Sequence, residues 1–433
     1  MSRLSTHRTS RRPITHRATG LTVAALLVTA LFACTAAPGS PSLEVPPRPP
    51  KTASTTVAPS PSQSTTPAAV PASAEPAGLR WVEGGMAGVA ATTDPAIAQE
   101  LFVLGWSRGY LGFTSTFTKA AAAMRSLLVT SSSDGLHWQS AGRLDLGGDD
   151  AGVIVTQVVE GPAGLLATGE PPGCSIHKAA VRMWRSADGT TWTPIDLEGV
   201  FGADSLPSVS GGSAGYIVLA ASGSERAVWT SSDGASWRKR AVPLGGFNPQ
   251  SVASFGGGFL LAGTTDVAPP DCGGTTGDAV AHRKGSAWSS LAGSPWASAD
   301  LPNVLDGTET TMSVNRLNDE TVLAEEVATT KAAPNGVVRD WTSSDGLTWR
   351  QNDALTRSLG YLLTDGTRTV FVGSTDQGGL VIRVLTHDLR AAILVADTAG
   401  PTIRGVGEAA LGPAGIVVAD GAGSTSWLGV PIP

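Results

Sequence analysis

A nine-residue motif that begins and ends with tryptophan recurs along this chain and limits its fold more than any other feature. Its four clearest copies occupy residues 184–192, 229–237, 341–349 and 130–138, the last with Thr in place of the first tryptophan. We call this the tryptophan motif. Copies spaced roughly 40–60 residues apart, with several short strands in each interval, are typical of a β-propeller.

The centre of each motif predicts a tight hairpin turn. Its Asp-Gly pair suits a turn in which glycine takes a positive φ, and the Ser and Asp side chains can bond the N–H groups of the turn. The closing tryptophan can cover the seam to the next blade with its apolar face. We therefore predict a structural role, neither catalytic nor metal-binding, for twelve residues. These are Asp134, Gly135, Trp138, Asp188, Gly189, Trp192, Asp233, Gly234, Trp237, Asp345, Gly346 and Trp349.

The positions of the last tryptophan in successive motifs give the number of repeats. Degenerate copies at 282–288 and 386–392 place Trp288 and Ala392 at that position, and Trp81 ends a half copy near the start. Counted from Trp81, the intervals are 57, 54, 45, 51, 61, 43 and 43 residues, the last running to position 435. We predict an all-β, seven-bladed propeller, with six or eight blades as the alternatives.

The ends of the folded part carry complementary halves of the motif. Trp427 would have its partner at position 435 (427 + 8), beyond the last residue, Pro433. The half copy that ends at Trp81 matches the missing part. An N-terminal strand should therefore complete the last blade, which removes an open sheet edge.

The motif resembles the Asp box of the bacterial neuraminidase repeat, found in sialidase-type propellers and in relatives that are not sialidases. The family form is Ser-x-Asp-x-Gly-x-Thr-Trp, and Ser343, Asp345, Gly346, Thr348 and Trp349 match its residue types. One residue is missing between Asp and Gly, so this form is shortened. The resemblance implies a sialidase-like propeller over residues 79–433, with the boxes at its periphery and away from any active site.

Sialidase chemistry, as that family has it, needs three arginines, a tyrosine nucleophile with a glutamate partner, and an aspartate acid/base. The chain has three tyrosines, Tyr110, Tyr216 and Tyr361, and lacks the family's Arg-Ile-Pro signature. No nucleophile elbow, zinc-protease helix or P-loop is present either. We therefore expect no catalytic residues and no cofactor. The arginines and glutamates that could face a central channel are Arg316, Arg383, Arg404, Glu325, Glu326 and Glu408.

Residues 1–33 read as an export signal. Five arginines precede an apolar stretch, Leu21 to Ala33, that is shorter than the ~20 residues needed to span a bilayer. Leu31 to Cys34 resembles a bacterial lipobox, which implies cleavage before Cys34 and its lipidation. The alternative is an ordinary secretory signal with a chance cysteine. We expect an exported chain, lipid-anchored on the outer face of the cell membrane.

Residues 34–78 comprise the lipidated Cys34 and a linker rich in Ala, Pro, Ser and Thr, a composition that predicts a disordered stalk. Without residues 1–33 the charge balance is 25 Lys and Arg (30 − 5) against 36 Asp and Glu, a net −11. So acidic a chain lacks the basic clusters that phosphate contacts require. We expect no nucleic-acid partner.

Cys174 and Cys272 each lie two residues after a Pro-Pro pair, in a predicted loop. In an exported chain, such a pair predicts a disulfide. The alternative is a metal site built on Cys174 and His177, but no second ligand pair lies near them in sequence, and we expect no metal.

The loops before the tryptophan strands vary most in length, with long forms at 107–125, 170–180, 264–279 and 327–337. Variable loops on a rigid scaffold commonly carry binding sites. We predict a monomeric, non-enzymatic binding or scaffold lipoprotein of the cell envelope, which holds a glycan, peptide or protein on this loop face. The alternatives are a divergent sialidase-like glycoside hydrolase and an assembly factor for a membrane complex.

Overall fold

The computed structural model describes residues 79–431 with internal gaps. The gaps are 87–93, 95, 119–123, 145–152, 171–181, 198–199, 201–207, 223–224, 243–245, 268–281, 291–293, 303, 305–308, 319, 330–336, 353–360, 375–379, 386–391, 395–408 and 420–424. All described residues belong to one unit of the chain, Ala72–Pro433. None of them forms a helix long and apolar enough to cross a membrane.

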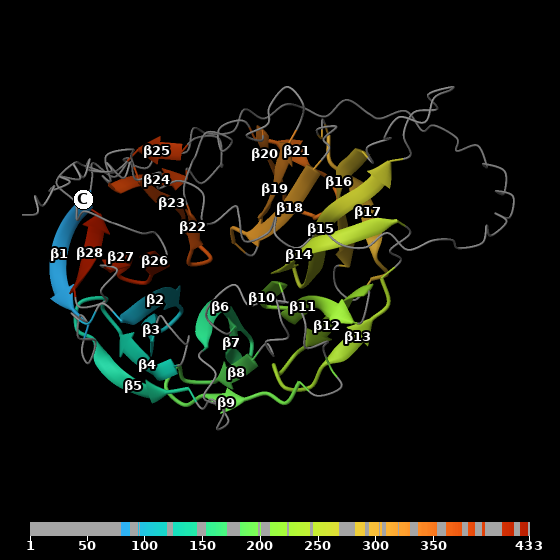
Figure 1. The fold of residues 1–433 in the computed structure, drawn as a ribbon. Coiled ribbons are helices and arrows are strands. Elements are labelled where there is room, and N and C mark those ends of the chain that lie inside the picture. The colour runs from blue at the N-terminus through green and yellow to red at the C-terminus, as the bar shows by residue number, and fades with distance from the viewer. Residues whose placement is uncertain are drawn as a thin grey trace, which may run out of the picture. The chain divides into compact units, whose positions relative to one another are not determined.

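The described residues form seven four-stranded antiparallel sheets arranged as blades in a ring (Figure 1). The strands run from the inside of the ring outward within each blade. Blades 1 to 3 are β2 (Ile97–Trp106), β3 (Gly109–Thr118), β4 (Met124–Ser132), β5 (Gln139–Arg143); β6 (Ile154–Gly161), β7 (Gly164–Glu170), β8 (Arg182–Ser186), β9 (Thr193–Pro194); and β10 (Ser208–Gly212), β11 (Gly215–Ser222), β12 (Glu225–Ser231), β13 (Arg238–Arg240).

Blades 4 to 7 follow the same plan. They are β14 (Phe247–Phe255), β15 (Gly258–Val267), β16 (His282–Ser290), β17 (Ala297–Asp300); β18 (Glu309–Arg316), β19 (Val322–Thr329), β20 (Val337–Ser343), β21 (Arg350–Gln351); β22 (Tyr361–Thr364), β23 (Thr369–Ser374), β24 (Leu380–Leu385), β25 (Ala392–Leu394); and β26 (Ala409–Gly412), β27 (Gly415–Ala419), β28 (Thr425–Pro431), β1 (Leu79–Gly85). The prediction of a seven-bladed propeller is confirmed.

The second strand of each blade explains why the sequence has apolar runs without alternation. β27 is buried at every position, and β3 at almost every position, because both faces of these strands pack against neighbouring blades. Several of these strands begin with a glycine of positive φ that follows a two-residue hairpin turn, among them Gly109 and Gly415. The core therefore lies in the seams between blades.

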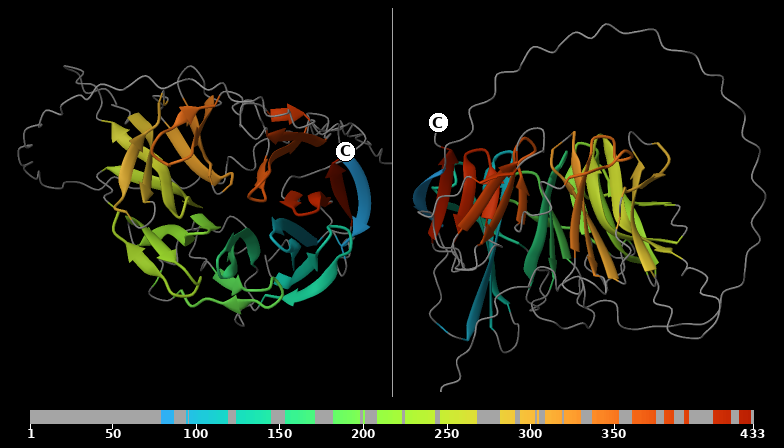
Figure 2. Two further views of the ribbon diagram at one scale, coloured as in Figure 1. Left: turned by 180° about the vertical axis from the view of Figure 1, so that it is seen from behind. Right: turned by 90° about the horizontal axis from the view of Figure 1, so that it is seen from above.

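The N-terminal strand closes the ring as predicted. β1 pairs with β28 from Leu79 opposite Pro431 to Gly85 opposite Thr425, and the two strands lie side by side in both views of Figure 2.

The register shows that Trp81 supplies the missing tryptophan of the last blade. In intact copies the first tryptophan pairs with the residue two positions beyond the last one, as Trp229 does with Lys239. Trp427 pairs with Glu83 in the same way. Trp81 therefore occupies the position of the closing tryptophan.

The motif of blade 4 lies eight residues later than its sequence indicated. Trp288 is within the third strand and pairs with Leu261 and Ser298, which is the register of a first tryptophan. The closing tryptophan is Trp296, and not Trp288 as the sequence indicated. This copy has lost its aspartate, so local residue types no longer identified the turn and only strand pairing does.

One of the four predicted long loops is wrong. Residues 109–118, inside the segment 107–125, form the ten-residue strand β3, since alternating Phe and Thr suit a strand buried on both sides. The other three, 170–180, 264–279 and 327–337, fall largely outside the described residues. The strand ends that flank them all lie at the same end of the blades, because each joins a second to a third strand.

The tryptophan motifs pack against the preceding blade, and not the next one as predicted. Trp192 of blade 2 meets Phe113 of blade 1 edge-on, with ring centroids 5.4 Å apart. A Cβ on Gly135 of blade 1 would lie 2.7 Å from Val417 of blade 7. The motif's spacing predicts a covered seam, but which neighbour it covers depends on the hand of the ring.

Candidate functional site

The propeller has two ends with different construction. The turn face carries the hairpin turns between first and second strands and the tryptophan motifs between third and fourth strands. The loop face carries the connections between second and third strands and those from blade to blade. Most loop-face connections lie in the gaps, so the described candidate groups are those of the strands and the turn face.

Each tryptophan motif on the turn face is a turn held by its own side chains. Asp345 Oδ1 accepts hydrogen bonds from the amides of Leu347 and Thr348, at 2.8 and 2.6 Å. Ser343 Oγ donates to the same carboxylate at 3.0 Å and accepts from the amide of Gly346 at 2.8 Å. The carboxylate thus satisfies turn amides that have no strand partner.

The other three motifs repeat this geometry. Asp134, Asp188 and Asp233 each accept from the amides two and three residues later, at 2.7 to 2.9 Å. The glycines of all four turns have φ between 67° and 77°, a region that disfavours side chains. Four separate blades carry these aspartates, so the fold does not gather them into one site.

Hydrogen bonding also sets the charge state of these aspartates. The amide of His137 is the main cause that lowers the pKa of Asp134, and the amides of Thr191 and Ser236 act in the same way on Asp188 and Asp233. At Asp345, burial opposes the shift, but bonds from Thr348 and Leu347 bring the pKa to about 2. These carboxylates are therefore ionised acceptors at neutral pH.

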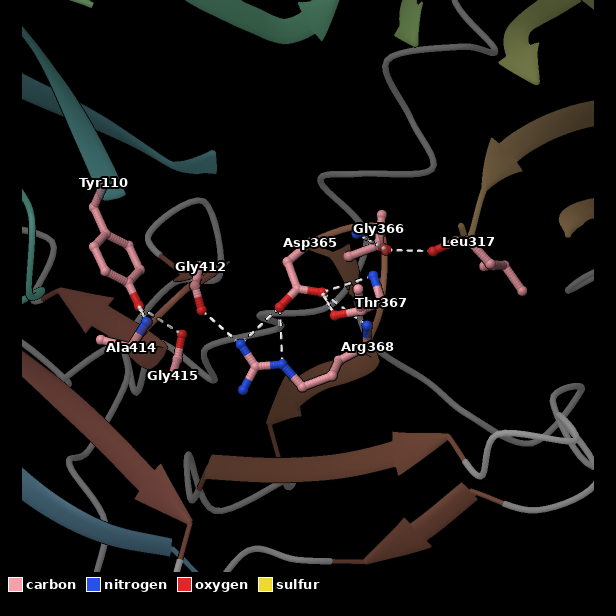
Figure 3. A network of polar contacts seen from close by, with 10 residues as sticks. Tyr110, Leu317, Asp365, Gly366, Thr367, Arg368, Gly412, Ala414 and Gly415 are labelled. Carbon is pink, nitrogen blue, oxygen red and sulfur yellow. Dashed lines mark hydrogen bonds and ion pairs between the residues drawn. The ribbon is translucent and has the colours of Figure 1, made fainter. Parts of the chain in front are cut away.

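Two of the three tyrosines form hydrogen bonds between blades. Tyr110 of blade 1 donates to the carbonyl of Gly415 in blade 7 at 2.9 Å and accepts from the amide of Ala414 at 3.1 Å (Figure 3). Tyr216 of blade 3 donates to the carbonyl of Gly164 in blade 2 at 2.8 Å. Both rings are buried, and burial raises the pKa of each phenol to about 12. The third, Tyr361, lies in β22, and its side chain is outside the described part.

A charged turn in blade 6 links this blade to blade 7, and sequence reasoning missed it. Asp365 accepts from the amides of Thr367 and Arg368 at 2.9 and 2.7 Å. The Arg368 guanidinium bonds the same carboxylate and donates to the carbonyl of Gly412 in blade 7 at 2.7 Å (Figure 3). Burial opposes the lowered pKa of Asp365, and these amide and guanidinium bonds outweigh it. The Asp-Gly pair at 365–366 was the available signal.

Glu160 makes a comparable link between blades 1 and 2. Its carboxylate accepts from the amide of Ser107 at 3.0 Å and from the hydroxyl of the same residue. Nothing in the spacing of the sequence singles out this contact, because 53 residues separate the partners.

Polar side chains also join the inner strands of blades 2 to 5. Gln157 Oε1 accepts from the amide of Val209, and Gln250 Oε1 accepts from that of Met312 at 2.6 Å. Ser210 Oγ accepts from the amide of Ser254 at 2.9 Å. These hydroxyls and amides belong to inner strands, where they satisfy backbone groups of the adjoining blade.

The arginines and glutamates proposed for a channel do not converge. Glu325 and Glu326 are neighbours on β19 and point to opposite faces of blade 5. A Cβ on Gly285 of blade 4 would lie 3.2 Å from Glu326 Oε1, and one on Gly212 of blade 3 would lie 3.1 Å from an Arg316 nitrogen. Arg383 belongs to blade 6. Arg404 and Glu408 lie outside the described residues.

Glu100 is a carboxylate on inner strand β2 that the sequence did not single out. It is exposed, yet burial of its surroundings raises its pKa.

The cysteines that we predicted to be lipidated or paired, Cys34, Cys174 and Cys272, lie outside the described residues, as does His177. Within the described part of the propeller, no three His, Cys, Asp or Glu side chains lie close enough together to hold a metal ion.

No family model matches the chain, and no curated protein matches it. Among solved structures, the chain is similar to a polysaccharide lyase of family PL25, an ulvan lyase, at 12% identity over 81% of this chain and 96% of that one, with a TM-score of 0.40. It is also similar to the six-bladed lectin of Aleuria aurantia, at 10% identity, 70% and 97% coverage and a TM-score of 0.36.

A thermostable family-43 glycoside hydrolase is similar at 12% identity, over 73% of this chain and 97% of that one, with a TM-score of 0.34. Likenesses of this size carry no argument about what the present propeller binds.

Proposed function

We propose that this protein is an exported, lipid-anchored, non-enzymatic propeller of the cell envelope that binds a glycan, peptide or protein partner. Its tryptophan motifs would be shortened Asp boxes that serve the fold. Cys34 would carry the lipid, residues 35–78 the stalk, and the loop face the binding surface.

One observation carries this proposal: the reactive side chains that recur in the repeat make hydrogen bonds that hold the fold together. The four motif aspartates hold their own turns, and the hydroxyls of Tyr110 and Tyr216 hold backbone groups of neighbouring blades. A phenol with a pKa of about 12 inside a seam is poorly suited to nucleophilic attack. This supports a scaffold whose loops, rather than its repeats, recognise a partner.

Capture from native envelope extracts tests the proposal. A Cys34→Ala chain should leave the membrane fraction. When this chain is used as bait, we expect it to retain partners that an unrelated acidic propeller, used as a parallel control, does not retain. The same preparation should show no turnover on a panel of fluorogenic glycosides. Turnover that disappears in Arg316→Ala would instead establish a glycoside hydrolase and overturn the non-enzymatic proposal.

A further inference from the structure

The joint between blades 5 and 6 has a small apolar centre. Its buried residues are Leu317 and Leu323 of blade 5 and Phe371 and Leu385 of blade 6. Residues two apart on a strand share a face, so Glu325, two positions beyond Leu323 on β19, also faces blade 6.

Two carboxylates lie side by side on this face of blade 5. Glu325 on β19 is directly opposite Asp340 on β20, and such pairs have Cβ atoms about 5 Å apart on one side of the sheet. Asp340 is only 3% exposed. Burial raises the pKa of Glu325, and no hydrogen bond or ion pair within the described residues offsets that cost.

Among its described residues, blade 6 presents one charged side chain to these carboxylates. Arg383 is opposite Phe371 and two residues from Leu385, so it lies on the surface that faces blade 5. The neutral Ser313 is opposite Glu325 on the inner strand. Other nearby charges point elsewhere, since Glu326 faces blade 4 and Arg368 reaches Gly412 of blade 7. Arg350 on β21 is opposite Thr342, which is on the same face as Leu323, so this exposed arginine also lies on the face toward blade 6. Among the described residues, the charged groups on the facing surfaces of the joint are therefore Glu325, Asp340, Arg350 and Arg383.

The joint is fastened at its turn end. The hydroxyls of Thr364 and Thr369 both donate to the carbonyl of Leu317, and Asn318 forms an isolated bridge with Gly366. The inner strands β18 and β22 are in looser contact than β10 with β14 or β14 with β18, which carry side-chain bonds along their length. Figure 1 shows the two blades on either side of the joint.

We propose that the joint between blades 5 and 6 is a pH-sensitive hinge of the ring, which tightens when Glu325 is protonated and loosens when it is ionised. Ionised Glu325 is desolvated in the joint, which costs free energy. Protonation removes that cost. This hinge is a property of the fold and stands whether or not the proposed binding function holds.

The direction of the pH effect follows from the raised pKa of Glu325. The closed joint binds this proton more tightly than an open joint, in which the carboxyl has its ordinary pKa. Closure is therefore favoured as the pH falls from neutral through the raised value toward the ordinary one. Above the raised value the carboxyl is ionised in both forms, and the cost of closure is fully present.

Hydrogen exchange of the full chain tests the hinge. Protection factors, corrected for intrinsic exchange, are measured at about pH 7.5 and at about pH 4.5. The lower value is close to the ordinary pKa of a glutamate carboxyl. We expect several-fold greater protection at acid pH in peptides from β19, β20, β22 and β24, and a smaller change in peptides from β10 to β12.

Glu325→Gln should make the protection of the joint independent of pH and as high at neutral pH as the parent's at acid pH. Glu100→Gln is the matched control, because Glu100 is another carboxyl whose pKa burial raises, on blade 1. It should leave the pH response of the joint unchanged.

Three results would overturn the hinge. Equal protection of the joint at both pH values in the parent chain does so without any variant. Lower protection in Glu325→Gln would mean that Glu325 stabilises the closed joint. Loss of the pH response in Arg383→Gln would assign the effect to an ion pair between the blades rather than to a desolvated carboxyl.

Discussion

At the residue scale, the aspartates of the tryptophan motifs act as acceptors for their own turns. Each replaces the hydrogen bonds that a strand partner would otherwise provide, and the glycine that follows supplies the positive φ that the turn requires. This role could be predicted from sequence, because the residues involved lie within four positions of one another. The seam contact of the same glycine could not, because Leu260 and Gly346 meet only in the folded ring.

Asp345→Asn should lower the free energy of unfolding at neutral pH by roughly 1.5–3 kcal/mol, the range for hydrogen bonds to a charged group. The stabilisation depends on a pKa of about 2 in the folded chain. It is complete above the ordinary aspartate pKa and is lost as the pH falls toward 2. The difference between parent and variant should therefore shrink on acidification in urea titrations. Glu320→Ala, at an exposed turn residue, is the control, and a pH-independent difference would contradict this account.

At the element scale, side chains in and beside the hairpin turns of the turn face link several pairs of neighbouring blades. Tyr110, Tyr216, Glu160 and Arg368 all reach backbone groups of an adjoining blade. The sequence offered a weak signal for the two tyrosines, since each follows the glycine that opens a second strand. It offered none for their partners, which lie about 50 to 300 residues away.

Removing the phenolic hydroxyls tests the hydrogen bonds that the two tyrosines make between blades. Tyr216→Phe should cost about 1 kcal/mol, because the carbonyl of Gly164 loses its buried donor. Tyr110→Phe should cost more, since its hydroxyl serves both Gly415 and Ala414. Urea denaturation at one pH measures both variants. Costs in the reverse order, or no cost in either, would show that the hydroxyls do not hold the seams.

At the scale of the whole molecule, strand β1 completes a ring that the C-terminal end leaves open. It covers the edge of β28 and places Trp81 at the position of the closing tryptophan. Its tip also meets blade 1, where Gly85 forms a bridge with His137. An open propeller exposes the edge of a sheet, which favours association between chains.

Deleting residues 35–85 should lower the melting temperature and cause concentration-dependent association, seen by light scattering after gel filtration. Deleting residues 35–77 removes the predicted linker but keeps β1 and is the matched control. That shorter deletion should behave like the parent chain. A monomeric, equally stable 35–85 deletion would mean that β1 is dispensable for closure.

The sequence by itself determined the all-β class, the seven blades and the closure by an N-terminal strand. These follow from a local motif whose spacing survives in the chain, including the half copy at Trp81. Only the tertiary structure decided that the motifs cover the preceding blade, that Trp296 closes the motif of blade 4, and that Glu325 faces blade 6. The physical reason is that repeat spacing counts the elements, whereas neighbours, strand register and the burial of a charge arise from contacts between residues far apart in the chain.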